Sequence, residues 1–258
     1  MKRAGAVALN TFREAVRDRV LYNLFFFALL MMAAAIFVGQ ISIGIEEQVI
    51  KSLGLTAISV IGLLIAVFIG VGLVYKEMDK RTLYALLAKP VRRWEFLLGK
   101  FGGLALTLAV NTLAMTAGLF AAILYVKHHL ERADAVLLIA IYFILLKLFL
   151  VVALALLFSC FSTPLLAILY TTAFYVSGLF VMELRTFHFE NESPMMGSLR
   201  RGLSYLLPNF ENFDVMGAAA HGRAIPRDLI LQNTAYAALY CAVVLLIAAA
   251  VFSRRNLK

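Results

Sequence analysis

The chain has 258 residues, of which 63% are hydrophobic and 15% are charged. A soluble domain averages about 45–50% apolar and about 25% charged residues, and a chain of this length buries only about three quarters of its surface. The apolar excess therefore excludes an ordinary soluble protein and indicates a lipid bilayer. A net charge of +9 would suit nucleic acid in a soluble protein, so its meaning here depends on where the charges lie.

Six apolar segments are long enough to cross a bilayer core of about 30 Å, which needs about 20 helical residues. Helix is required because an isolated apolar strand would leave its backbone groups unpaired in lipid. The segments are Val20–Val38, Leu55–Val74, Phe101–Val126, Ala135–Phe158, Leu165–Leu184 and Asp228–Phe252. We expect an all-α integral membrane protein with six transmembrane helices in a single transmembrane domain over residues 1–258.

The residues before the first span carry an amphipathic pattern. Leu9, Phe12, Val16 and Val20 recur at spacings of three and four, and charged residues fall largely between them. The pattern predicts an interfacial elbow helix over residues 1–19 that turns into the first span. A simple helical extension of the first span is the alternative.

Lysine and arginine are unevenly divided between the two faces of the expected bundle. Fifteen lie with the two ends of the chain and residues 75–100, against eight on the opposite face, and five of those eight lie in one long loop. Long loops count little in the positive-inside rule. We expect both termini on the cytoplasmic side of a bacterial or archaeal cytoplasmic membrane. The positive charge then reflects topology and lipid headgroups, not nucleic acid.

Residues 75–100, between the second and third spans, contain a short helical pattern. Thr82 can cap a helix that Pro90 ends. One apolar face of this helix consists of Leu83, Leu86 and Leu87. Basic residues surround this face, and such a projecting helix suits insertion into a groove on a soluble partner. Gly99, Gly102 and Gly103 follow, where a neighbouring helix can approach closely.

The order of residues in this segment is specific. It runs through Glu77, Thr82-Leu83, Leu86-Leu87-Ala88-x-Pro90, Arg93-x-Glu95-Phe96 and Gly99-Lys100. This order resembles the permeases of ABC-2 type transporters, and most closely the branch that includes the nitrous-oxide-reductase and multicopper-enzyme maturation permease. Asn10-Thr-Phe-Arg-Glu14 resembles the elbow helix of that family. One departure is Arg81, where many members have glycine.

The resemblance implies that a separate ABC ATPase subunit pushes on a coupling helix in this segment. The residues that form or border it are Glu77, Thr82, Leu83, Leu86, Leu87, Pro90, Arg92, Arg93 and Glu95. It also implies a second permease copy or a paralogue, because one six-span chain is half of such a pore. An ordinary positive-inside loop is the alternative for this segment.

The chain itself is not expected to be an enzyme. A phosphate-binding loop needs Gly-x-x-x-x-Gly-Lys-Ser/Thr, whereas Gly99-Lys100 is followed by Phe101. We therefore expect no cofactor on this chain, with ATP and Mg bound by the partner ATPase. The cysteines and histidines show no spacing typical of a metal site.

Lys147 lies in the middle of the fourth span. A lysine at the bilayer centre costs about 2.5–3.5 kcal/mol on insertion scales and should face the protein interior, a cavity or a partner. Asn111 and Tyr240 occur at comparable depth and could bond to it. We interpret these residues as part of a substrate path or interface, with Lys147 contacting an anionic group such as a lipid phosphate. Helix packing or a dimer interface is the alternative.

Residues 185–227 form a long extracytoplasmic loop in this topology. Residues Leu203–Phe213 of this loop are too apolar for a free linker. Their composition predicts short helices that lie on the membrane surface or dip into it. The loop could also meet an extracytoplasmic partner.

The leading hypothesis is a permease subunit that couples ATP hydrolysis by its partner to export or force transmission. Two alternatives are a membrane scaffold without transport and a membrane-embedded enzyme. An enzyme would need convergent polar groups, which the spans scarcely offer. The coupling pattern would serve a scaffold equally well.

Overall fold

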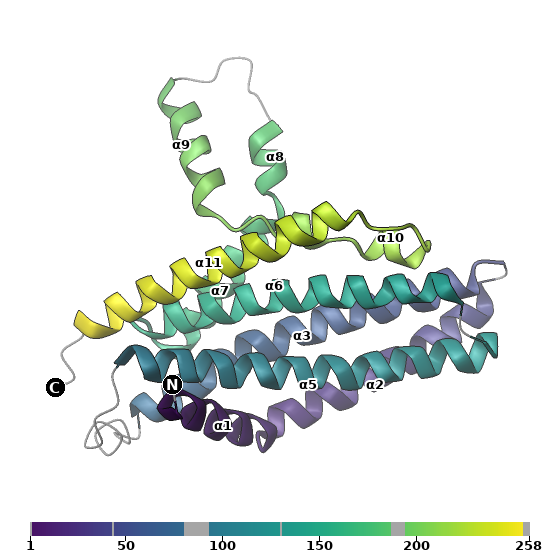
Figure 1. Ribbon diagram of the computed structural model, residues 1–258, viewed down its shortest axis with the longest axis horizontal. Coiled ribbons are helices and arrows are strands. Elements are labelled where there is room, and N and C mark those ends of the chain that lie inside the picture. The colour runs from purple at the N-terminus through teal and green to yellow at the C-terminus, as the bar shows by residue number, and fades with distance from the viewer. Residues whose placement is uncertain (1, 43, 80–92, 130, 187–193, 255–258) are drawn as a thin grey trace.

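The computed structural model describes residues 2–42, 44–79, 93–129, 131–186 and 194–254, and every regular element among them is helical (Figure 1). The long helices are α2 (Arg19–Ile41), α3 (Glu46–Asp79), α5 (Arg93–Lys127), α6 (Val136–Ser159) and α11 (Arg227–Arg254). The shorter ones are α1 (Lys2–Val16), η1 (Arg132–Ala135), α7 (Pro164–Leu179), α8 (Val181–Thr186), α9 (Pro194–Leu206), η2 (Glu211–Phe213) and α10 (Met216–Ala220).

Five helices in the described part of the chain are long and apolar enough to cross a membrane. They are the long helices α2, α3, α5, α6 and α11, and they contain the expected spans one to four and six, except that Ala135 at the start of span four lies in η1. The chain is therefore an all-helical, multi-pass membrane protein. Most of these helices are longer than the apolar segments, since residues that flank those segments are helical as well.

The expectation for the fifth span was wrong in one respect, because Leu165–Leu184 is not one helix. Helix α7 has 16 residues and ends at Leu179, and α8 begins after Phe180 (φ −103°, ψ 15°). The carbonyl of Gly178 accepts a hydrogen bond of 3.1 Å from the backbone N–H of Phe210. A Cβ atom at Gly178 would lie 2.4 Å from the carbonyl oxygen of Pro208. The segment 207–213 thus packs directly against the end of α7.

This same segment lies deep between the helices. Phe210 and Phe213 are fully buried. The hydroxyl of Tyr240 donates a 2.7 Å hydrogen bond to the carbonyl of Leu206, and Tyr240 lies 13 residues after the first residue of α11. That is about 20 Å along the helix. The chain between α9 and α10 therefore reaches the middle of the bundle, where its apolar composition is accommodated.

Helix α6 is the centre of the bundle. Most of its side chains are buried, and it packs against α3, α5, α7 and α11. Helix α2 is peripheral, with Phe26 and Phe37 about two-thirds exposed, at 67% and 66%. Such a surface suits contact with lipid.

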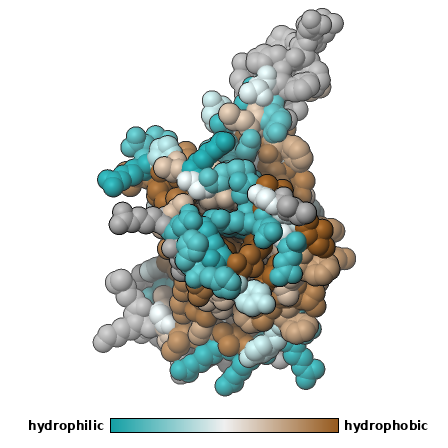
Figure 2. All heavy atoms as spheres, turned by 90° about the vertical axis from the view of Figure 1, so that its right-hand side faces the viewer, coloured by the Kyte–Doolittle hydropathy of each residue, from teal (hydrophilic) through white to brown (hydrophobic). Residues whose placement is uncertain are grey.

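The two ends of the bundle differ in what they contain. Both termini lie at one end, which we call the terminal end (Figure 1). The opposite end, called the distal end, holds the α2–α3 connection, η1 and α10. Figure 2 faces the distal end and shows hydrophilic side chains gathered over it, with hydrophobic ones along the sides of the bundle.

Candidate coupling surface at the terminal end

Helix α1 is held against the start of α5 by close backbone approach. A Cβ atom at Gly99 would lie 2.6 Å from Cβ of Val7, and one at Gly103 would lie 2.5 Å from the carbonyl oxygen of Ala8. Only glycine permits this spacing without a shift. The sequence prediction that these glycines receive a neighbouring helix is confirmed, and the neighbour is α1.

A charged pair joins the same two helices. Lys100 on α5 is 1% exposed, and its Nζ lies 3.9 Å from Oε2 of Glu14 on α1. The Nζ also lies 5.9 Å from the ring centre of Phe96, which stacks on Phe252 near the end of α11 at a centroid distance of 6.1 Å. Glu14 and Lys100 belong to the two separate sequence patterns that carried the family resemblance, and the fold brings them together.

The buried face of α1 differs from the apolar stripe seen in the sequence. Thr11 and Ala15 are fully buried, whereas Leu9 is 47% exposed and Val20, which already belongs to α2, is 44% exposed. Val7, Ala8 and Thr11 face the glycines of α5, and Leu9 is left for the surroundings. Asp18 accepts a 3.0 Å hydrogen bond from the backbone N–H of Val20 and caps α2. Helices α1 and α2 are therefore separate, not one extended helix.

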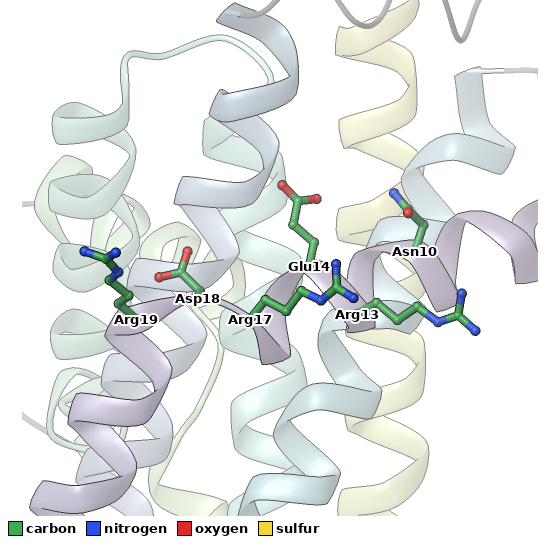
Figure 3. Close-up of a pocket in the computed structure, with 6 residues that line it drawn as sticks. All are labelled: Asn10, Arg13, Glu14, Arg17, Asp18 and Arg19. Carbon is green, nitrogen blue, oxygen red and sulfur yellow. The ribbon is translucent and has the colours of Figure 1, made fainter.

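An open polar hollow of about 700 Å³ follows the bend between α1 and α2 (Figure 3). Its described lining consists of Asn10, Arg13, Glu14, Arg17, Asp18 and Arg19. Three arginines against two carboxylates give this surface a positive excess. It is suited to acidic side chains of a soluble protein or to phosphate groups.

Most of the expected coupling residues lie outside the described residues. These are Thr82, Leu83, Leu86, Leu87, Pro90 and Arg92. Glu77 lies in the last turns of α3, Arg93 is the first residue of α5, and Glu95 follows in its first turn. The two ends of the expected segment 75–100 are helical, because α3 continues to Asp79 and α5 begins at Arg93.

Lys147 is buried in the interior, as expected for a charge in a span. It is 4% exposed, and its ammonium group donates a 2.7 Å hydrogen bond to Oγ of Ser59 on α3. The Nζ also lies 6.0 Å from the ring centre of Tyr175 on α7. Lys147 thus links α6 to two neighbouring helices.

The expected partners of Lys147 make other bonds. Asn111 donates a 2.9 Å hydrogen bond to the carbonyl of Thr107 in its own helix, and Tyr240 bonds to Leu206. Neither residue is bonded to Lys147 here, and their assignment to a substrate path or interface stays a prediction. Ser59 and Tyr175 were not identified, because depth along a helix can be counted from sequence whereas the direction of each side chain cannot.

A second group that sequence reasoning missed lies at the distal end. Lys51 is 3% exposed and forms ion pairs with Glu47 and with the buried Asp134. Lys127 lies 3.0 Å from Glu47 and 2.8 Å from Glu131, and its hydrogen bond holds the pKa of Glu131 below the usual value. The spacing of four residues in two of these pairs was a usable signal. The Lys51–Asp134 pair, across the fold, was not.

A family model described as ABC-2 family transporter protein matches residues 5–257 of the chain. The chain therefore belongs to the ABC-2 transporter family. It is a membrane permease component of an ABC transporter, and membership implies pairing with an ABC ATPase subunit. No curated protein matches the chain.

Proposed function

We propose that this permease couples ATP hydrolysis by a separate ATPase subunit to export or to force transmission across the membrane. The observation that carries the proposal is the close contact of α1 with α5. It joins Glu14 to Lys100 directly after the expected coupling helix and places an arginine-rich hollow beside it.

The same contacts suggest how a push would travel. A force on residues 82–88 would act on their two flanking helices, α3 and α5. Helix α5 would carry α1 with it, because the contacts at Gly99 and Gly103 leave no room for sliding. Helix α11 would follow through the Phe96–Phe252 stack. Bistable packing of this kind can turn a local push into a helix movement.

The proposal includes the expected topology and assembly. Both termini would face the cytoplasm, two permease copies or a paralogous pair would bind two ATPase subunits, and residues 185–227 would lie outside. We also propose that the chain belongs to the branch of maturation permeases. The proposal names no substrate. Lys147 would contact an anionic group of the substrate once the helices around it separate.

Co-purification of the ATPase with the permease tests this proposal. Changing Leu86 and Leu87 to Asp should abolish co-purification, because charged side chains would replace the apolar face of the coupling helix. Leu257→Asp makes the same chemical change at the basic carboxyl-terminal segment and should leave co-purification intact.

Two outcomes would contradict the proposal. Association that survives the double change would place the coupling helix elsewhere. Association without any effect of the permease on ATP turnover would favour the scaffold alternative, since a scaffold recruits its partner without transmitting force.

A further inference from the structure

The bend between α1 and α2 lies at the level of the membrane surface. Helix α2 has 23 residues, which is about 34 Å of helix and close to the bilayer core of about 30 Å. Its first residue, Arg19, therefore lies near one boundary of that core.

One exposed face of α2 indicates the same depth. Arg19, Tyr22 and Phe26 follow one another at spacings of three and four residues, so they share a side of the helix. Tyr22 is 58% exposed and Phe26 is 67% exposed. A charged, then an amphipathic, then an apolar side chain is the order expected where a helix passes from the lipid headgroups into hydrocarbon.

The polar hollow at this bend opens at that depth (Figure 3). Arg19 belongs both to the lining of the hollow and to the exposed face of α2. The volume of about 700 Å³ falls within the range of about 300–1,000 Å³ that is usual for small-molecule sites. The hollow is therefore placed and sized to receive a lipid headgroup.

The positive groups of the hollow are available to an external anion, and the negative ones are not. Glu14 faces Lys100 at 3.9 Å, and Asp18 accepts the backbone N–H of Val20. Within the part of the chain that the structure describes, the exposed guanidinium groups of the hollow form no ion pair or hydrogen bond. These groups belong to Arg13, Arg17 and Arg19.

We propose that this hollow binds the phosphate group of an anionic phospholipid. Guanidinium groups bind phosphate oxygens through paired hydrogen bonds, and arginines at an anionic membrane surface add to the attraction. The acyl chains would lie along the exposed apolar side of α2. An acidic surface of the ATPase is the weaker candidate, because a soluble protein would gain nothing from the lipid-facing side chains that border the hollow.

The bound lipid would connect the two helices of the bend. Arg13 and Arg17 belong to α1, whereas Arg19 belongs to α2, so one phosphate held by all three joins them. The lipid would thereby hold α1, which packs on α5, at a fixed angle to the first span. In the proposed topology this lipid belongs to the cytoplasmic leaflet, and in this respect the inference rests on the proposed function.

Binding of phosphatidylglycerol to the purified permease, titrated in detergent and counted by mass spectrometry of the intact protein, tests the proposal. Changing Arg13 and Arg17 to Gln should weaken binding by about tenfold or more, because two charge-assisted contacts are lost. Changing Arg223 and Arg227 to Gln is the matched control. It removes two exposed arginines at the start of α11 and should leave the affinity unchanged.

Two results of this titration would overturn the proposal. One is equal binding of phosphatidylglycerol by wild type and by the variant that lacks Arg13 and Arg17. The other is equal binding of phosphatidylcholine and phosphatidylglycerol by wild type, because the net charge of the headgroup would then not matter.

Photocross-linking locates the lipid without any variant. Phosphatidylglycerol with a photoreactive group on its headgroup should label residues 10–22, which include the hollow and the first turn of α2. Excess inorganic phosphate should not prevent this labelling, because free phosphate lacks acyl chains. Labelling confined to other segments would overturn the proposal. So would loss of labelling in phosphate, which would identify a site for a free ion.

The failure of this inference can be told apart from failure of the proposed function. If the variant that lacks Arg13 and Arg17 keeps phosphatidylglycerol but loses the ATPase, the hollow is a docking surface for the ATPase and only the lipid assignment is wrong. If no ATPase co-purifies with wild-type protein, the proposed function fails, whereas lipid binding is measured on the permease alone.

Discussion

The two ends of the bundle are held together by different interactions. At the distal end, Lys51 on α3 forms an ion pair with Asp134 of η1 and a second one, within α3, with Glu47, and Lys51 and Asp134 are almost fully buried. At the terminal end, α1 meets α5 through glycine contacts and one 3.9 Å charged contact, beside an open hollow.

This difference suggests a division between a fixed end and a movable end. Buried ion pairs fix relative helix positions, because separating them exposes uncompensated charge. Glycine contacts depend on shape alone, and a helix pair can move as a unit when its neighbours shift. An ATPase that acts at the terminal end would therefore tilt helices about the distal end.

The largest expected effect concerns the fixed end. Lys51→Met leaves the buried Asp134 without its partner and should destabilise the protein by about 3–5 kcal/mol. The measurement is thermal or denaturant unfolding in detergent. Lys127→Met is the matched control. Its lysine is more accessible, at 14% exposed against 3%, so its cost should be smaller.

A paired replacement sharpens this prediction. Changing Lys51 to Met together with Asp134 to Leu removes both charges and should recover most of the loss. A double variant as unstable as Lys51→Met alone would show that the ion pair is not what holds the distal end together.

The next effect concerns the movable end. Gly103→Ala places a Cβ atom 2.5 Å from the carbonyl oxygen of Ala8 and should cost about 1–3 kcal/mol through overpacking. It should also reduce ATPase coupling, because α1 must shift away from α5. Gly102→Ala is the control, since its Cβ atom would lie 3.6 Å from Ala8, an ordinary contact. Equal behaviour of the two variants would argue against close docking of α1.

The helices of this protein could be predicted from its sequence more completely than the contacts between them. The apolar segments of α2, α3, α5, α6 and α11 were predictable because a bilayer requires about 20 apolar residues in helix. The break at Phe180 was not, because it depends on Phe210, thirty residues later in the chain, bonding to Gly178. Its local sequence is as apolar as an unbroken span.

The candidate site shows the same limit. The glycines after the coupling segment signalled a close helix neighbour, and their spacing made this visible. The identity of that neighbour required the fold. The pairs Glu47–Lys51 and Lys127–Glu131 are four residues apart and could be read from sequence, whereas the link of Lys51 to Asp134 depends on where α6 begins.

Lys147 lies between the two ends and should affect function more than stability. Lys147→Met retains the length of the side chain, removes a buried charge and should leave thermal stability unchanged or higher. ATP turnover of the complex should lose its response to phosphatidylglycerol vesicles, measured against phosphatidylcholine. Lys147→Arg keeps the charge and should retain part of the response. A full response in Lys147→Met would exclude contact with an anionic group.

The smallest effect is expected from Glu14→Gln. The contact is long, at 3.9 Å, and the carboxylate of Glu14 is 38% exposed, so its replacement by a neutral amide that can still face the buried Lys100 should cost about 1 kcal/mol. Comparing the free energies of unfolding of Glu14→Gln and Gly103→Ala shows whether the charged contact or the close packing contributes more to stability at the terminal end. A larger loss in Glu14→Gln than in Gly103→Ala would reverse that ranking and show that charge dominates at both ends.

Hydrogen–deuterium exchange of the permease–ATPase complex tests the central claim most directly. Addition of a non-hydrolysable ATP analogue should change exchange in residues 2–16 and 93–103, at the contact between α1 and α5. Residues 46–54 and 131–140 at the distal end should keep their exchange. Changes confined to the distal end, or no change at the terminal end, would contradict the account that the ATPase acts through the α1–α5 contact.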